Sequence, residues 1–269
     1  MTNKAFYIAL GASASLLAFS SHACTLTMGY RTNERPPLIA KSPDNSGLYQ
    51  HFYQVVANKI GCELDIVRGP KKRILKQLQD GEIDFYPGFN FNDQRAEFTF
   101  FIANGFPGGE IGISRSDFPL ITALEQLEGY TILQALGSPD FVRDLESVKI
   151  YAVPEMTIDK AVGLLRKNRG DFYIYNGASI RHYLRTNSSN DIKVHPNCCG
   201  DVNPIYLGFS RHSPHFKEVE NPSYRNDKPK GPYNFPTQLD SDSKAYQMKQ
   251  VLEQMALDGE TESIYQQYY

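Results

Sequence analysis

The spacing of apolar residues alternates along the chain between that of β-strands and that of α-helices. A short apolar strand over residues 26–30 precedes residues 48–60, where apolar side chains recur at helical spacing. A strand over residues 63–67, a helix with apolar positions at 74–78 and a strand over residues 83–86 follow. This order of strands and helices predicts a mainly parallel sheet flanked by helices.

A second set of strands and helices follows a stretch at 105–112 whose glycines allow hinge dihedrals. A strand over 205–209 then returns, and residues 244–269 predict two helices separated by Gly259. The segment 214–240 contains five prolines and is expected to be a long loop. The second set comprises a strand at 130–135, a helix from Pro139, a strand at 149–153, a helix at 158–165 and a strand at 171–175.

The tripeptide Asp-Phe-Tyr occurs at residues 84–86 and again at residues 171–173, each time after a helical pattern and a glycine-containing turn. The repeat predicts two similar α/β lobes, with coincidence as the alternative. Ligands of open α/β sheets bind beyond the carboxyl ends of the strands, so two facing lobes would form a cleft. Asp84 and Asp171 are expected to organise the strand starts rather than to contact a ligand.

The amino-terminal 23 residues have the features of a secretory signal. Lys4 supplies the positive charge, residues 5–19 are mostly apolar, and small residues precede a cleavage point after Ala23. We therefore expect a periplasmic protein, with lipid anchoring at Cys24 as the less favoured alternative. No later stretch is apolar enough to span a bilayer, and the net charge of −2 gives no electrostatic reason to expect nucleic acid as a partner.

The chain has four cysteines, and export would place them in an oxidising compartment. Cys24 and Cys62 each precede a predicted strand. If these strands are parallel neighbours, the two cysteines lie at one sheet edge and a disulfide is plausible. Cys198 and Cys199 are either free or joined in a rare vicinal bond. A metal site with His195 lacks the usual ligand spacing, so we expect no metal.

The order of several short motifs resembles the extracytoplasmic solute-binding proteins of family 3, the polar amino-acid type of ABC importer. The resemblance spans nearly the whole chain after residue 23. The motifs are Gly29-Tyr30, Gly61-Cys62-Glu63-Leu64, Gly81 to Asp84, Asp93 to Phe98, Leu136-Gly137-Ser138, Arg169-Gly170-Asp171 and Asp258 to Tyr265.

This resemblance implies an α/β, two-lobed periplasmic-binding-protein-like fold of type II. Each lobe would be a mainly parallel sheet flanked by helices, with a two-strand hinge between them. Residues 24–107 and 206–269 would form lobe 1, including the C-terminal helices, and residues 108–205 would form lobe 2.

The resemblance also implies ligand-binding residues. Arg95 corresponds to the arginine that grips the ligand carboxylate in the family, and a guanidinium group suits that task. Ser138 corresponds to the lobe 2 segment that meets the same carboxylate, at an expected helix start. Asn176, next to Tyr175, stands near the position of the carboxylate that usually holds the ligand ammonium. This departure argues against a standard α-amino acid, unless Asp140 or Glu110 compensates.

Further candidates follow the predicted strands of lobe 1. Tyr86, Phe89 and Asn90 follow the third strand, where aromatic rings would stack on a ligand or hold a cation. Because side chains alternate along a strand, one of Phe85 and Tyr86 must face the core. Tyr30 and Arg31 follow the first strand at the expected cleft rim. Arg31 or Arg35 is a second anion partner or a solvated charge, and the basic run at 71–73 is interpreted as a solvated face.

These observations favour capture of a small polar or charged, amino-acid-like solute by lobe closure, for delivery to the membrane permease of an ABC importer. A ligand-sensing subunit of a membrane receptor and a dehydratase-like acid–base enzyme on the same fold are the alternatives. No catalytic motif is recognisable, so we expect no enzyme, no cofactor and a monomer.

Overall fold

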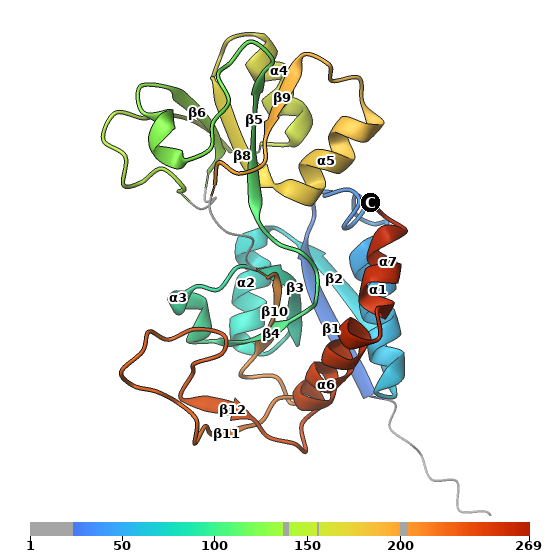
Figure 1. Ribbon diagram of the computed structural model, residues 1–269. Coiled ribbons are helices and arrows are strands. Elements are labelled where there is room, and N and C mark those ends of the chain that lie inside the picture. Colours follow the sequence, from blue (N-terminus) through green and yellow to red (C-terminus); the bar gives the residue numbers. More distant parts are fainter. Residues whose placement is uncertain (1–23, 137–139, 155, 200–203) are drawn as a thin grey trace, which may run out of the picture.

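The computed structural model describes residues 24–136, 140–154, 156–199 and 204–269, which form two five-stranded sheets with helices around each (Figure 1). The chain passes from the first sheet to the second between β4 and β5, and it returns between β9 and β10. The expected signal segment and Ser138 lie outside the described residues. No helix in the described ranges is long and apolar enough to cross a membrane.

The first sheet has the strand order β2-β1-β3-β10-β4, in which β1 runs parallel to β2 and β3 while β10 is antiparallel to β3 and β4. The antiparallel β10 is the strand that returns from the second lobe. The strands are β1 (Cys24–Arg31), β2 (Cys62–Gly69), β3 (Phe85–Phe89), β4 (Thr99–Ala103) and β10 (Tyr206–Ser210).

Helices cover both faces of the first sheet. Successive side chains of β1 point to opposite faces, so each face of the strand meets a different helix. Tyr30 packs against Tyr49 of α1, whereas the neighbouring Gly29 faces Ile74 of α2. The two C-terminal helices α6 and α7, red in Figure 1, lie beside α1. The helices are α1 (Leu48–Lys59), α2 (Lys71–Asp80), α3 (Asp93–Ala96), α6 (Lys244–Leu257) and α7 (Glu260–Gln266).

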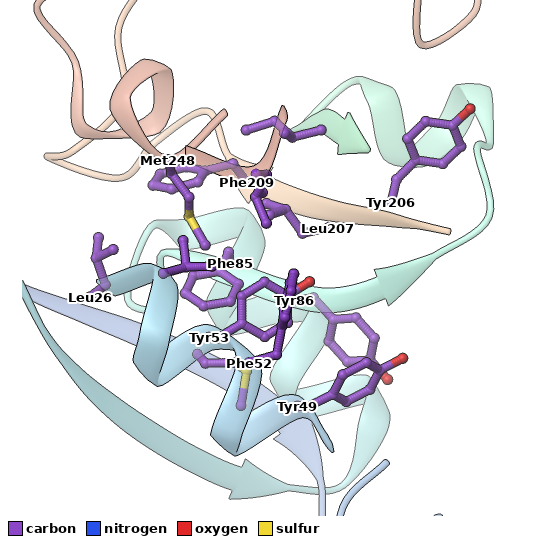
Figure 2. Packing of buried hydrophobic residues seen from close by; sticks show 14 of the residues in the cluster. Leu26, Tyr49, Phe52, Tyr53, Phe85, Tyr86, Tyr206, Leu207, Phe209 and Met248 are labelled. Carbon is purple, nitrogen blue, oxygen red and sulfur yellow. The ribbon is translucent and has the colours of Figure 1, made fainter. Parts of the chain in front are cut away.

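The core of this lobe is rich in aromatic side chains. Figure 2 shows Phe52 and Tyr53 of α1, Phe85 of β3, Phe209 of β10 and Met248 of α6 packed together, and none of them is more than marginally exposed. Burial of such large rings contributes strongly to stability. The core therefore joins segments from both ends of the chain into one lobe.

The second sheet has the order β7-β6-β8-β5-β9, in which β6 runs parallel to β7 and β8 while β5 is antiparallel to both of its neighbours, β8 and β9. It has a separate apolar cluster on each face, because Leu133 and Tyr173 belong to one cluster and their neighbours Ile132 and Phe172 to the other. The elements are β5 (Glu110–Arg115), the 3-10 helix Leu124–Leu127, β6 (Thr131–Ala135), β7 (Lys149–Val153), α4 (Ile158–Arg166), β8 (Phe172–Asn176), α5 (Gly177–Thr186) and β9 (Ile192–His195).

The repeated tripeptide occupies equivalent positions in the two lobes. The backbone N–H of Thr27 donates to Asp84 Oδ2 at 2.7 Å, and that of Thr131 donates to Asp171 Oδ2 at 2.9 Å. Each aspartate returns a backbone hydrogen bond to the same threonine. The predicted role of Asp84 and Asp171 in organising strand starts is confirmed.

Both cysteine pairs are bonded. Cys24 and Cys62 are directly opposite each other at the first positions of β1 and β2, and their disulfide has an S–S distance of 2.05 Å. The expected pairing is therefore confirmed. Cys198 and Cys199 form the vicinal disulfide, and Cys198 is buried against the second sheet.

Some local expectations were wrong. The described residues 140–148 form turns instead of the helix expected from Pro139. The helix α5 and the strand β9 were not anticipated, although Asn176 followed by apolar residues at helical spacing is a start signal. The long loop at 214–240 contains a small hairpin made of β11 (Glu218–Glu220) and β12 (Thr237–Leu239).

Candidate ligand-binding cleft

A cleft of about 980 Å³ lies between the two lobes. Its volume falls near the upper end of the range of small-molecule sites, about 300–1,000 Å³. On the first lobe it is lined by the ends of β1 and β3 and by the start of α2, and on the second lobe by the ends of β6 and β8. The carboxyl ends of the parallel strands of both lobes therefore face the same space.

Stacked aromatic rings form the first-lobe wall. The Tyr86 and Phe89 rings stack with their centres 4.3 Å apart and their planes within 7°. Both side chains are buried and both line the cleft, as predicted, while Phe85 lies in the core. Tyr30 does not line the cleft, contrary to expectation, because it lies behind this wall, 1% exposed, and stacks on Tyr86.

Arg95 lines the cleft from α3, a single helical turn that follows β3. The Asn92 side chain begins this turn by accepting a hydrogen bond from the backbone N–H of Arg95 at 3.1 Å. The guanidinium carbon lies 4.7 Å from the centre of the Phe89 ring, so the wall holds the arginine side chain in place. Burial lowers the pKa of Arg95, although a guanidinium stays charged at neutral pH.

Three more cations line the first-lobe side: Arg31 at the end of β1, Arg35 in the loop that follows it, and Lys71 in the first turn of α2. Lys71 is half-buried, which corrects its interpretation as part of a solvated face, whereas Lys72 and Arg73 are exposed. Burial lowers the pKa of the Lys71 ammonium to about 8, and the charges of Arg31, Arg95 and Arg35 lower it further.

Arg68 fixes the loop that carries Arg35. Its guanidinium donates to the backbone oxygens of Arg31 at 2.8 Å, of Ala40 at 2.8 Å and of Asp44 at 3.0 Å. The loop is thus tied to β2 at several points. Nothing in the sequence pattern singled out Arg68, because its role depends on carbonyl groups brought to it by the folded loop.

Each carboxylate that lines the cleft either accepts a hydrogen bond from a neighbouring side chain or is exposed to water. Asn90, which lines the cleft as predicted, donates to Glu110 Oε1 at 3.1 Å. Asp159 is exposed and accepts a hydrogen bond from the Tyr183 hydroxyl at 2.9 Å, and Glu34 is exposed. Among the described residues, none of the four cleft cations forms an ion pair with a carboxylate.

Asn176 and Tyr175 line the second-lobe side. The Asn176 side-chain oxygen caps α5, since it accepts from the Ser179 backbone N–H and from the Ser179 hydroxyl, both at 3.0 Å. This oxygen thus has both of its acceptor positions in use. Tyr175 lies opposite Arg35 across the cleft, with 4.8 Å between its ring centre and the guanidinium carbon.

The carboxyl-terminal Tyr269 also lines the cleft and was not anticipated. Its ring stacks on Tyr265 with centres 4.4 Å apart and meets the His182 ring of α5 edge-on. Tyr269 therefore joins the first-lobe helices to the second lobe. Within the described ranges, no group of three or more His, Cys, Asp and Glu side chains is placed to hold a metal ion.

Comparison with known proteins shows what this architecture resembles. The model of the family named bacterial extracellular solute-binding proteins, family 3, matches residues 26–269. No curated protein matches the sequence.

Several solved structures share the architecture. An ancestral arginine-binding protein bound to arginine has a TM-score of 0.66 at 19% identity and covers 91% of this chain and 98% of its own. The ancestral amino acid-binding protein AncCDT-1, a precursor of cyclohexadienyl dehydratase, has a TM-score of 0.67 at 15% identity, covering 91% and 95%. An amino acid ABC transporter substrate-binding protein from Streptococcus pneumoniae, bound to L-arginine, has a TM-score of 0.64 at 13% identity, covering 91% and 94%. At such identities the likeness shows the fold, and it confirms the two-lobed periplasmic-binding-protein-like type.

Proposed function

Because the chain belongs to the bacterial extracellular solute-binding proteins of family 3, we propose that it captures a small polar or charged, amino-acid-like solute by closure of its two lobes. The family places the protein outside the cytoplasm. Residues 1–23 would direct export and be removed, leaving a periplasmic chain. A membrane permease of an ABC importer would receive the solute.

The observation that supports this proposal most strongly is Arg95 in the cleft between the lobes. Its side chain is held over the Phe89 ring, and it has no ion-pair partner among the described carboxylates. A guanidinium in that position is available for two charge-assisted hydrogen bonds to one carboxylate. The binding of an anionic group would thus complete a site that the protein leaves positive.

Closure would bring groups of the second lobe to the same solute. Residues 24–107 and 206–269 would move as one lobe against residues 108–205, with the two connections next to β4–β5 and β9–β10 as the hinge. Tyr175 and Asn176 line the cleft from the second lobe. A solute that contacts both lobes binds the closed form better and shifts the equilibrium toward it. Ser138 is a further candidate contact on this lobe.

A thermal-shift screen tests the proposal, with amino acids, small organic acids, polyamines and sugars as ligands and titration calorimetry of each hit. We expect at least one solute to raise the melting temperature and to be recovered chemically unchanged by mass spectrometry. Arg95→Gln should abolish that shift, while Arg169→Gln, at an exposed turn, should keep it. Conversion of the solute, or an equal shift in both variants, would contradict capture at this cleft.

A further inference from the structure

We propose that the captured solute is a small organic dianion, either a dicarboxylate or a phosphate ester, and that its binding requires no ammonium group. This inference rests on the proposed function and names the class of solute for the same cleft. It follows from the excess of cations on the first-lobe side and from the way the oxygen acceptors of the cleft are already used.

Four cationic side chains reach the cleft from three separate segments of the first lobe. Arg31 and Arg35 come from the end of β1 and its loop, Lys71 from α2, and Arg95 from α3. Like charges in a partly buried space repel one another, and one carboxylate compensates a single charge. The low pKa of Lys71, about 8, reflects its burial and its proximity to the three arginines.

The tyrosines next to these cations carry no compensating charge. Burial raises the pKa of the Tyr86 and Tyr173 hydroxyls well above the usual value, so both stay neutral at neutral pH. The buried Nε atoms of Arg31 and Arg35 have no hydrogen-bond partner among the described residues. On the first-lobe side, the four cations therefore face one carboxylate among the described lining residues, the exposed Glu34.

The start of α2 adds to this preference for anions. Its first turn contains Lys71, Lys72 and Arg73 and no acidic residue, where the helix dipole would favour a carboxylate. Pro70 and Lys71 both line the cleft, so the positive end of the ten-residue helix lies at its wall. Together with the three arginines, this end would attract a second anionic group beyond the one that Arg95 would bind.

Ammonium groups have few acceptors available. The Asn176 oxygen caps α5, and the exposed Asp159 accepts from Tyr183. Among the described cleft carboxylates, Glu110 is half-buried and accepts from Asn90, whereas Glu34 is exposed to water beside Arg35 in the sequence. An ammonium ligand would have to compete for Glu110 and would add charge beside four cations.

Matched ligands test this inference, because glutarate is L-glutamate without its ammonium group. We expect glutarate to bind as tightly as L-glutamate or more tightly, and at least tenfold more tightly than L-glutamine or L-arginine, in titrations near neutral pH. Glycerol 3-phosphate serves as the phosphate-ester probe, and tight binding of either dianion supports the inference. Tighter binding of L-glutamine or L-arginine than of every dianion would overturn it and leave the proposed function intact. If no solute of any class binds, the proposed function fails as well.

Variants locate the second anionic subsite. Arg35→Gln and Lys71→Gln should each weaken glutarate binding at least tenfold and weaken binding of the monocarboxylate butyrate much less. Lys72→Gln, one residue along the same helix and exposed, should change neither. Glu110→Gln should strengthen glutarate binding a few-fold, since it removes a negative charge. Loss of binding in Glu110→Gln, together with unchanged affinity in Lys71→Gln and Arg35→Gln, would overturn the inference; thermal melts of each variant show that it is folded.

Discussion

The guanidinium carbon of Arg35 lies 4.8 Å from the centre of the Tyr175 ring, and these two residues belong to different lobes. The contact spans the cleft from the β1 loop to the end of β8. It is a cation–π interaction, whose contribution is about 0.5–2 kcal/mol depending on desolvation. The two lobes thus contact each other through a residue pair that also lines the cleft.

We predict that Tyr175→Leu shifts the ligand-free protein toward an open form, because the leucine side chain has no ring to hold Arg35. Tyr175→Phe keeps the ring and serves as the control. A loss of about 1 kcal/mol corresponds to about a fivefold change in the closed-to-open ratio. Small-angle X-ray scattering should give a larger radius of gyration for the leucine variant alone. Equal values for all three proteins would mean that this contact does not bias closure.

Arg95→Lys and Arg95→Gln should both weaken binding of a carboxylate solute, and the glutamine variant more so. Lysine keeps the charge but loses the planar fork, so we expect a loss of about 1–2 kcal/mol for lysine and about 2–4 kcal/mol for glutamine. Isothermal titration calorimetry measures both, with Arg169→Gln as the control. If the lysine variant binds the solute with the same affinity as the wild type, Arg95 does not bind the carboxylate through two hydrogen bonds.

Anion binding should weaken above about pH 8, with Lys71 responsible. Burial, together with Arg31, Arg95 and Arg35, lowers the pKa of Lys71 from 10.5 to about 8, so the free protein loses this charge as pH rises through that value. A bound anion favours the charged form, so binding takes up a proton near and above that pH. The three arginines stay charged throughout.

Titrations between about pH 6.5 and 9.5 test this, and we expect about a tenfold loss of affinity for a dianion over the upper part of that range. Buffers of different ionisation enthalpy should reveal the proton uptake. Lys71→Arg should remove most of the pH dependence, since arginine stays charged. A profile in Lys71→Arg identical to that of the wild type would assign the effect to another group.

Asp84→Ala should destabilise the protein more than Asp171→Ala, although the two aspartates occupy equivalent positions. Asp84 is 6% exposed and accepts from both the Thr27 backbone and the Ser213 hydroxyl, so its loss leaves buried donors unpaired. The Asp171 side chain is 29% exposed, and water replaces part of its bonding. We expect losses of about 2–4 and about 1–2 kcal/mol in urea unfolding. The reverse order would contradict this assignment.

Removal of the Cys24–Cys62 disulfide should lower the free energy of unfolding. The bond joins residues 38 positions apart, and closure of a loop of that length contributes about 4 kcal/mol in the chain-entropy account. Cys24→Ala with Cys62→Ala should therefore unfold at a lower denaturant concentration than the wild type. The same double change at Cys198 and Cys199 closes no long loop and should have a smaller effect. Equal losses would show that packing, rather than loop closure, sets the contribution.

The sequence by itself determined the parts of this protein that depend on local spacing. Alternating apolar residues gave most strands and helices, and the repeated Asp-Phe-Tyr gave the two related lobes with Asp84 and Asp171 at their strand starts. The disulfide of Cys24 with Cys62 followed because parallel strands align their beginnings. Strands, helices and their starting residues depend on residues close together in the chain, so they can be recognised from short sequence patterns.

The tertiary structure alone decided which side chains face the cleft. Tyr30 follows the first strand like Arg31, yet it packs behind Tyr86, because side chains alternate across a strand and the bulk of the ring fills the core. Lys71 lies in a basic run like its neighbours, but only its place at the start of α2 turns it inward. The cleft is assembled from loops far apart in the sequence. Their relative positions arise from packing between lobes, and this packing produces no periodic pattern in the sequence.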